Sequence, residues 1–190
     1  MNKIFIIGEA GVNHNGKLHL AKKLIDVAVK AGVDAVKFQT GKAEDLTTKY
    51  ADKAAYQNKN FKYGDTQYEM IKKLELSFDD FNELYQYSNK RDIKFLSTPF
   101  DLRSIEFLNN LGLDTIKIPS GEITNLPYLR KVGGLNKKLI MSTGMASMDE
   151  IEQALNVLLN SGSKKNKITI LHCTTAYPTP YEHVNLNCML

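Results

Sequence analysis

Polar and charged side chains stand directly after short apolar runs that look like strands. KIPSGE, residues 117–122, places a lysine, a serine and a glutamate within six residues. A packed interior rejects such groups, because burying an unpaired charge or polar group is costly. This strand end must therefore face solvent or a ligand.

Two lysines, Lys37 and Lys117, occupy predicted strand positions whose neighbours are apolar. Hydroxyl side chains end the neighbouring predicted strands, namely Thr98, Ser120, Ser142 and Thr143. Ammonium groups, hydroxyls and the backbone N–H groups of SGE and STGM are donors that proteins present to phosphate. We favour a bound phosphate, which uses both lysines, over the alternative that one lysine forms a Schiff base.

Glu9 begins the octet EAGVNHNG, which lies between the first predicted strand and the first predicted helix. A buried, ionised carboxylate beside lysines could align or deprotonate a nucleophile. The alternative is structural: a salt bridge from Glu9 to Lys37 or Lys117. The octet lacks the glycine spacing of a dinucleotide-binding loop.

The histidines and cysteines show no metal-binding spacing. His14, His19, His172 and His183 form no HExxH or HxH motif, and Cys173 and Cys188 form no CxxC. The sequence therefore predicts no metal site from these residues. His172 could line the site or be a satisfied core histidine. Two cysteines make no disulfide framework and favour a reducing, cytoplasmic location.

The elements that must position these residues alternate along the chain. β-branched runs predict six strands, at residues 4–8, 35–39, 94–97, 115–118, 138–142 and 168–172. An amphipathic helix is expected over residues 17–31, ending at Gly32, where a left-handed cap suits a glycine. Ser77 with Asp80 and Ser147 with Glu150 predict capping boxes at two further helices. Strands alternating with helices predict an α/β fold of parallel βαβ units.

All six predicted strands end in polar residues. In an open sheet only the strands at the switch point feed a ligand site, whereas in a (β/α)8 TIM barrel every strand does so. We therefore predict a TIM-type barrel, truncated to about six βα units because 190 residues fall short of the roughly 250 that are typical. Residues 40–76 make a long connection with a short helix near residues 67–74. A connection of this length usually has a function, and the sequence leaves two roles for it, a substrate lid or a contact between subunits.

Composition limits the function classes. The chain is 43% hydrophobic and 24% charged, as in ordinary globular proteins, and its net charge of +4 comes from scattered lysines. Nucleic-acid binding is therefore disfavoured. No apolar run is long enough for a signal peptide core or a membrane span, so we expect neither membrane nor nucleic acid as a partner.

Seven stretches together resemble the catalytic domain of the bacterial sialic acid synthase family: EAGVNHNG, DAVKFQT, KAEDL, FLSTPFD, KIPSGEITNLPYL, STGM and LHCTTAYPTPYEHVNL. The resemblance implies a barrel that condenses phosphoenolpyruvate with an N-acetylhexosamine, and we expect N-acetylneuraminate synthesis from N-acetylmannosamine. Legionaminate or another nonulosonate is the alternative product. A Schiff-base aldolase and a non-catalytic, truncated binding chain stay open as different functions.

The resemblance also implies residue roles. It assigns phosphoenolpyruvate binding to Lys37, Thr98, Lys117, Ser120, Ser142 and Tyr177, an acid/base or water-aligning role to Glu9, and a sugar contact to Gln39. It implies a divalent cation, Mn²⁺ or Mg²⁺, whose histidine ligands would lie beyond residue 190, and a homodimer of the full-length protein. Residues 1–190 would be a partial barrel without the family's antifreeze-like domain. We expect this chain alone to be inactive and poorly stable.

Overall fold

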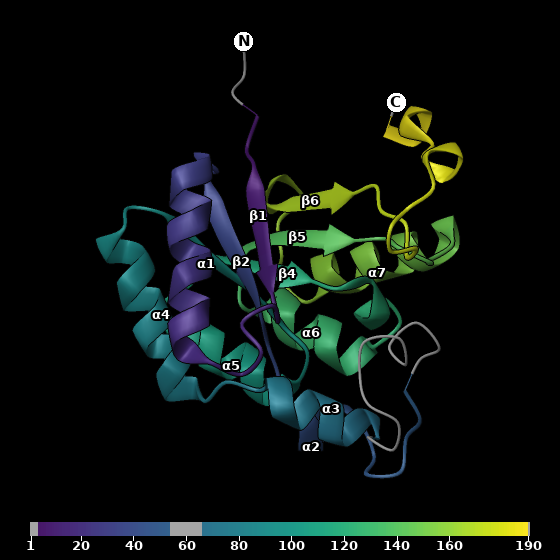
Figure 1. Ribbon diagram of the computed structural model, residues 1–190. Coiled ribbons are helices and arrows are strands. Elements are labelled where there is room, and N and C mark those ends of the chain that lie inside the picture. Colours follow the sequence, from purple (N-terminus) through teal and green to yellow (C-terminus); the bar gives the residue numbers. More distant parts are fainter. Residues whose placement is uncertain (1–3, 54–65, 190) are drawn as a thin grey trace. The chain divides into compact units, whose positions relative to one another are not determined.

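The computed structural model describes residues 4–53 and 66–189 of the chain (Figure 1). The chain divides into two compact units, unit 1 over Met1–Leu111 and unit 2 over Gly112–Leu190. Each unit contains a three-stranded parallel sheet with helices beside it. The predicted parallel α/β class is therefore confirmed, whereas the six-unit barrel stays a prediction.

Unit 1 has the strand order β1-β2-β3, formed by β1 (Ile7–Gly11), β2 (Ala35–Thr40) and β3 (Lys94–Pro99). Its helices are α1 (Leu18–Ala31), α2 (Ala43–Leu46), α3 (Gln67–Leu74), α4 (Phe78–Lys90) and α5 (Leu102–Asn110). Helix α1 packs against β1, β2 and α4, and α4 and α5 pack against β3 (Figure 1). The buried face of the sheet includes Phe38 and Phe95, whose rings stack with centroids 5.5 Å apart.

Unit 2 has the strand order β4-β5-β6, formed by β4 (Thr115–Ile118), β5 (Lys138–Ser142) and β6 (Ile168–Leu171). Its α-helices are α6 (Leu126–Gly134) and α7 (Met148–Asn160), which pack against each other. Short 3₁₀ helices complete it: η2 (Ser120–Glu122), η3 (Lys165–Lys167), η4 (Tyr181–His183) and η5 (Leu186–Met189). Its core side chains are apolar and fully buried, and include Ile116, Ile118, Leu129, Leu139, Met141 and Leu158.

The helix signals in the sequence are borne out. Ala21, Ile25 and Ala28 form the buried stripe of α1, and Gly32 closes the helix with a left-handed φ of 71°. Capping boxes begin α4 at Ser77 and α7 at Ser147. These local choices agree with the fold and set where each helix meets its strand.

The first strand is the main correction. It begins at Ile7 rather than at Ile4 and continues to Gly11, because its register with β2 pairs Ile7 with Ala35 and Gly11 with Phe38. The sequence predicted that the strand ends at Gly8, yet the ladder to β2 carries it on through Glu9. Residues 4–6 precede that ladder and are exposed. Glu9 therefore lies within a strand, not after one.

The long connection after β2 is partly described. The helix expected near residues 67–74 is confirmed as α3, and residues 54–65 lie outside the described residues. Lys42 Nζ donates to Glu75 Oε1 at 2.8 Å, which ties the two ends of the connection. Burial alone raises the pKa of Glu75, but hydrogen bonds from Lys42, Ala43 and Lys72 outweigh burial and leave this pKa below its ordinary value.

His14 is buried in the turn between β1 and α1, with 1% of its surface exposed. Its Nδ1 accepts a hydrogen bond from Gly16 N at 3.1 Å, while its buried Nε2 has no partner within the described part of the chain. Burial lowers the pKa of His14, and the charge of Asp80 opposes this only in part. The native state thus favours the neutral imidazole.

We predict that this histidine makes the fold sensitive to acid. Below pH of about 6.5 an unfolded chain binds a proton that native His14 resists, so the free energy of unfolding falls as pH drops through that value. His14→Asn keeps an acceptor for Gly16 and cannot titrate, so its urea midpoint should fall less than that of the wild type between about pH 7.5 and pH 5.5. His19→Asn, at an exposed position of α1, is the control and should follow the wild type. Equal pH dependence of His14→Asn and wild type would contradict this account.

Candidate active site

Unit 1 presents its polar side chains at the carboxyl ends of β1, β2 and β3. The register pairs Glu9 with Lys37 and Gln39 with Thr98. Register partners in a parallel sheet, and residues two apart along one strand, point to the same face. The structure therefore brings four of the predicted residues to one face of this sheet.

An ion pair joins Glu9 Oε2 to Lys37 Nζ. The Lys37 side chain is 12% exposed and that of Glu9 is 49% exposed. The salt bridge proposed as the structural alternative for Glu9 is thus present, and the expectation of a buried Glu9 is wrong. The cause is local: β1 is an edge strand of its sheet, and its register shifts between Glu9 and Gly11. A half-exposed, paired carboxylate can still accept a proton or orient water.

The other face of the same strand ends is locked by internal hydrogen bonds. Thr40 Oγ1 and Ser97 Oγ lie 2.7 Å apart, both fully buried. The buried carboxylate of Asp101 accepts from Lys42 N at 3.0 Å and from Ser104 N at 2.6 Å. These groups fix the loops that follow β2 and β3, so their role is structural.

Unit 2 buries the second lysine in its sheet. Lys117 is only 7% exposed, and its Nζ donates to Ile118 O at 2.8 Å and to Ser142 Oγ. The register places Lys117 opposite Ile140, so Ser142, two residues further along β5, shares its face. The prediction that Lys117 and Ser142 act together is consistent with this contact.

The loop after β5 approaches the KIPSGE turn closely. A Cβ built on Gly144 would lie 2.5 Å from Ser120 Oγ and 3.0 Å from Thr175 Cγ2, and Gly144 has a left-handed φ of 45°. Thr143 Oγ1 donates to Leu171 O at 2.8 Å and ties this loop to β6. Ser120 is therefore held against the loop, because only a glycine leaves it room.

The turn donors are fewer than predicted. The amide of Glu122 donates to Pro119 O at 3.1 Å, so it is engaged within the turn. Burial raises the pKa of the Glu122 carboxyl, and a hydrogen bond from Asn125 Nδ2 opposes this shift. Hydroxyl and ammonium groups, more than the amide of Glu122, make up the donor set of unit 2.

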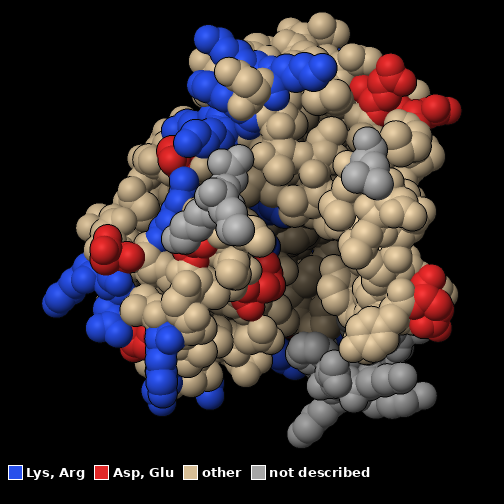
Figure 2. Space-filling view, turned by 90° about the horizontal axis from the view of Figure 1, so that it is seen from above, with Lys and Arg blue, Asp and Glu red and all other residues tan. Residues whose placement is uncertain are grey.

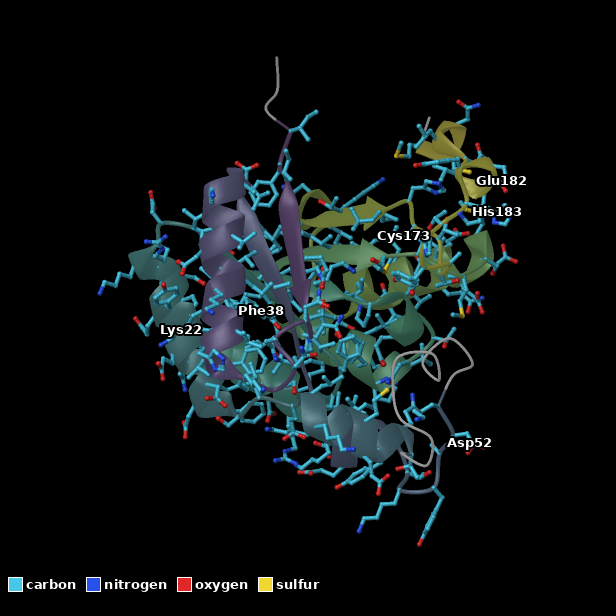
Figure 3. All side chains as sticks on the ribbon, in the orientation of Figure 1. Lys22, Phe38, Asp52, Cys173, Glu182 and His183 are labelled. Atoms are coloured by element: carbon cyan, nitrogen blue, oxygen red, sulfur yellow. The ribbon has the colours of Figure 1, made fainter. Side chains whose placement is uncertain are left out.

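Cys173 is a member of this cluster that sequence reasoning missed. Its Sγ lies 3.5 Å from Ser142 Oγ, and Figure 3 labels it just after β6. A clue to this contact is that Cys173 lies two residues beyond Leu171, which pairs with Ser142 in the parallel sheet. Cysteine spacing along the chain tests for metals and disulfides and could not reveal this contact.

The remaining predicted residues are dispersed. Tyr177 is 84% exposed in the segment after β6, and its binding role stays a prediction. His172 follows β6 directly, and its buried Nε2 has no partner among the described residues, so it is not the satisfied core histidine that was the alternative. His183 lies exposed on η4 (Figure 3).

Metal, membrane and polyanion sites gain no support. Residues 4–53 and 66–189 contain no cluster of three His, Cys, Asp or Glu that could hold a metal ion. No helix among them is long and apolar enough to cross a membrane. On the face shown in Figure 2, basic side chains form several groups with acidic side chains among them. This distribution agrees with the scattered charge of the sequence.

Comparison with known proteins places this arrangement in context. A sequence model of the NeuB family matches residues 24–190. The chain is 56% identical to the N,N'-diacetyllegionaminic acid synthase of Campylobacter jejuni, covering 100% of this chain and 57% of that protein. It is 49% identical to the enzyme of the same name from Legionella pneumophila, covering 97% and 52%. The chain thus spans about half the length of these curated relatives.

A solved structure shares the fold. The chain is similar to the N-acetylneuraminic acid (sialic acid) synthetase of Leptospira borgpetersenii, solved in complex with citrate. The TM-score is 0.83 at 32% identity, over 98% of this chain and 60% of that one. The likeness extends from the sequence motifs to the three-dimensional arrangement.

Gly144 offers a direct test of the cluster in unit 2. We predict that Gly144→Ala displaces Ser120 and weakens the binding of inorganic phosphate by about tenfold or more, as expected when a charge-assisted hydrogen bond is lost. Isothermal titration calorimetry measures this. Gly112→Ala is the matched control, because Gly112 has a φ of 91° but nothing within 4 Å of a built Cβ. Both variants strain the backbone, so an equal loss of phosphate affinity in both would argue against the assigned role of Ser120.

Proposed function

The chain belongs to the NeuB family, and on this premise we propose that it carries substrate-binding residues of a nonulosonate synthase that condenses phosphoenolpyruvate with an N-acetylated hexosamine. The observation that carries the proposal is the buried ammonium of Lys117 donating to Ser142, with Ser120 held nearby against Gly144. A buried cation surrounded by hydroxyl donors suits a phosphate group.

The proposed reaction has two stages: the two substrates condense, and hydrolysis then releases inorganic phosphate. Carbon 3 of phosphoenolpyruvate attacks the aldehyde carbon of the open-chain sugar, and water adds at carbon 2. The tetrahedral intermediate then loses inorganic phosphate by cleavage of its carbon–oxygen bond. The family resemblance implies a divalent cation, but the described residues form no ligand cluster, so no step is assigned to it.

Lys117, Ser120 and Ser142 would hold the phosphate. Phosphate charge is costly to bring out of water, and a buried ammonium offsets that cost more strongly than an exposed one, because the surroundings screen it less. The two hydroxyls supply directed hydrogen bonds. Together these groups favour retention of phosphate until the final bond cleavage.

The family resemblance assigns Glu9 and Lys37 to the substrates, and in unit 1 these two residues form an ion pair. The Glu9 carboxylate, half-exposed and paired with Lys37, suits the orientation of an attacking water. Thr98 and Gln39 share the same face, with Gln39 offering an amide to sugar hydroxyl or acetamido groups.

The identity of the sugar rests on the relatives. Identities of 56% and 49% are to proteins named for N,N'-diacetyllegionaminic acid, against 32% to the sialic acid synthetase. We therefore place the diacetamido sugar first and N-acetylmannosamine second, the reverse of the expectation from sequence motifs. The two substrates differ in an acetamido group, and a site built to hydrogen-bond such a group discriminates strongly against its absence.

The substrate order is tested with the protein expressed from its own gene. Phosphate release is followed with phosphoenolpyruvate, Mn²⁺ and either N-acetylmannosamine or its diacetamido analogue, and the product is identified by mass. We expect kcat/KM to be at least about tenfold higher for the diacetamido sugar, the effect of one well-placed polar contact. A preference for N-acetylmannosamine would reverse the substrate order. Phosphoenolpyruvate binding without phosphate release with any sugar would instead support a non-catalytic binding chain.

A Schiff-base aldolase is the second candidate, because Lys117 is a buried lysine of the kind that such enzymes use. Lys117 Nζ donates to Ile118 O and to Ser142 Oγ. An ammonium and a neutral amine can both make these two bonds, so a chemical trapping experiment is needed to decide.

Borohydride trapping distinguishes these candidates. We predict that pyruvate and borohydride leave the mass of the protein unchanged, and that Lys117→Met weakens phosphoenolpyruvate binding by about a hundredfold, the loss expected for a desolvated charge pair. Lys138→Met, at an exposed position of β5, is the control and should bind normally. A reduced adduct mapped to Lys117 would establish the aldolase instead.

A further inference from the structure

We propose that Cys173 is a positioning residue for Ser142: its thiol holds the Ser142 hydroxyl so that the hydroxyl proton points toward the bound phosphate. The inference rests on the function proposed above and extends it to a residue with no role assigned there. Two contacts that share one atom support it: Lys117 Nζ donates to Ser142 Oγ, and Cys173 Sγ lies within hydrogen-bond reach of the same Oγ.

The positions of these residues follow from the parallel sheet. Ser142 ends β5 and pairs in register with Leu171 of β6, and Cys173 lies two residues further on. Its Sγ is 3.5 Å from Ser142 Oγ, within reach of a hydrogen bond to sulfur. Cys173 is half-buried, so part of the residue stays accessible to solvent.

The orientation of the Ser142 hydroxyl follows from its number of protons and lone pairs. A serine hydroxyl has one proton and two lone pairs. Lys117, as a cation, can only donate to it and so occupies one lone pair. When the thiol S–H of Cys173 donates to the second lone pair, the single proton of Ser142 is left to point away from both groups. A phosphate oxygen is the acceptor that this proton suits.

Without the thiol, the hydroxyl loses this constraint. Alanine at residue 173 offers neither donor nor acceptor, so one lone pair of Ser142 stays unmatched and the hydroxyl is free to rotate. Serine at residue 173 is close to alanine in size and restores both functions. The two substitutions therefore separate the loss of a hydrogen bond from the loss of volume.

The test compares Cys173→Ala, Cys173→Ser and the control Cys188→Ala, which changes the exposed cysteine on η5. Phosphoenolpyruvate binding is measured by calorimetry, and KM and kcat with the preferred sugar. We expect Cys173→Ala to weaken binding about three- to tenfold, the effect of one hydrogen bond, and to raise KM more than it lowers kcat. Cys173→Ser should stay within about twofold of the wild type, as should Cys188→Ala, since neither removes that bond.

The wild type supplies an independent measurement. Alkylation of Cys173 by iodoacetamide is followed by mass spectrometry. It should slow by about tenfold in saturating inorganic phosphate, because the bound phosphate shields Cys173 and only the small unbound fraction of the protein reacts. Cys188 serves as the internal control and should react at the same rate with or without phosphate.

The outcomes separate the two levels of the proposal. Equal losses in Cys173→Ala and Cys173→Ser, normal binding by Cys173→Ala, or no protection of Cys173 by phosphate would each overturn the positioning role and leave the proposed function standing. A wild-type protein that binds neither phosphoenolpyruvate nor inorganic phosphate overturns both.

Discussion

The buried ammonium of Lys117 is the constraint that determines which polar groups must surround it in unit 2. Removing such a charge from water costs several kcal/mol unless polar groups replace its hydration. Ile118 O and Ser142 Oγ do so from the same and the neighbouring strand. The need for such an oxygen explains why the apolar run of β5 ends in Ser142. Of these two oxygens, only the Ser142 hydroxyl also carries a proton that it can donate to an anion, because a carbonyl oxygen only accepts.

Unit 1 meets the same constraint in another way. Lys37 is also largely buried, but its ammonium is paired with the Glu9 carboxylate on the neighbouring strand. An opposite charge stabilises the cation and reduces its pull on a further anion. The two lysines therefore differ in the groups that hold them: the Glu9 carboxylate lies beside Lys37, whereas Ile118 O and Ser142 Oγ accept hydrogen bonds from Lys117.

Sequence alone predicted the elements whose signals are local. The strands at residues 115–118 and 138–142 have the predicted bounds, because short β-branched runs lie between turn residues. The bounds of β1 could not be predicted, because they depend on pairing with β2, which begins at Ile7 and extends to Gly11. Cys173 was missed for the same reason: its contact depends on the register of two strands. Local chemistry is readable from the chain, but contacts set by strand pairing are not.

The connection after β2 has a fixed base, which bears on whether it is a lid or a subunit contact. The side chains of Lys42 and Glu75 are 12% and 10% exposed, and Lys42 Nζ also lies 4.7 Å from the Phe78 ring centroid. Removing either partner alone would leave the other charge buried and unpaired, which costs roughly 3–5 kcal/mol, so each residue holds the other in place. Of the two roles, the described ends of this connection suit a fixed wall or contact surface better than a lid that moves as a whole.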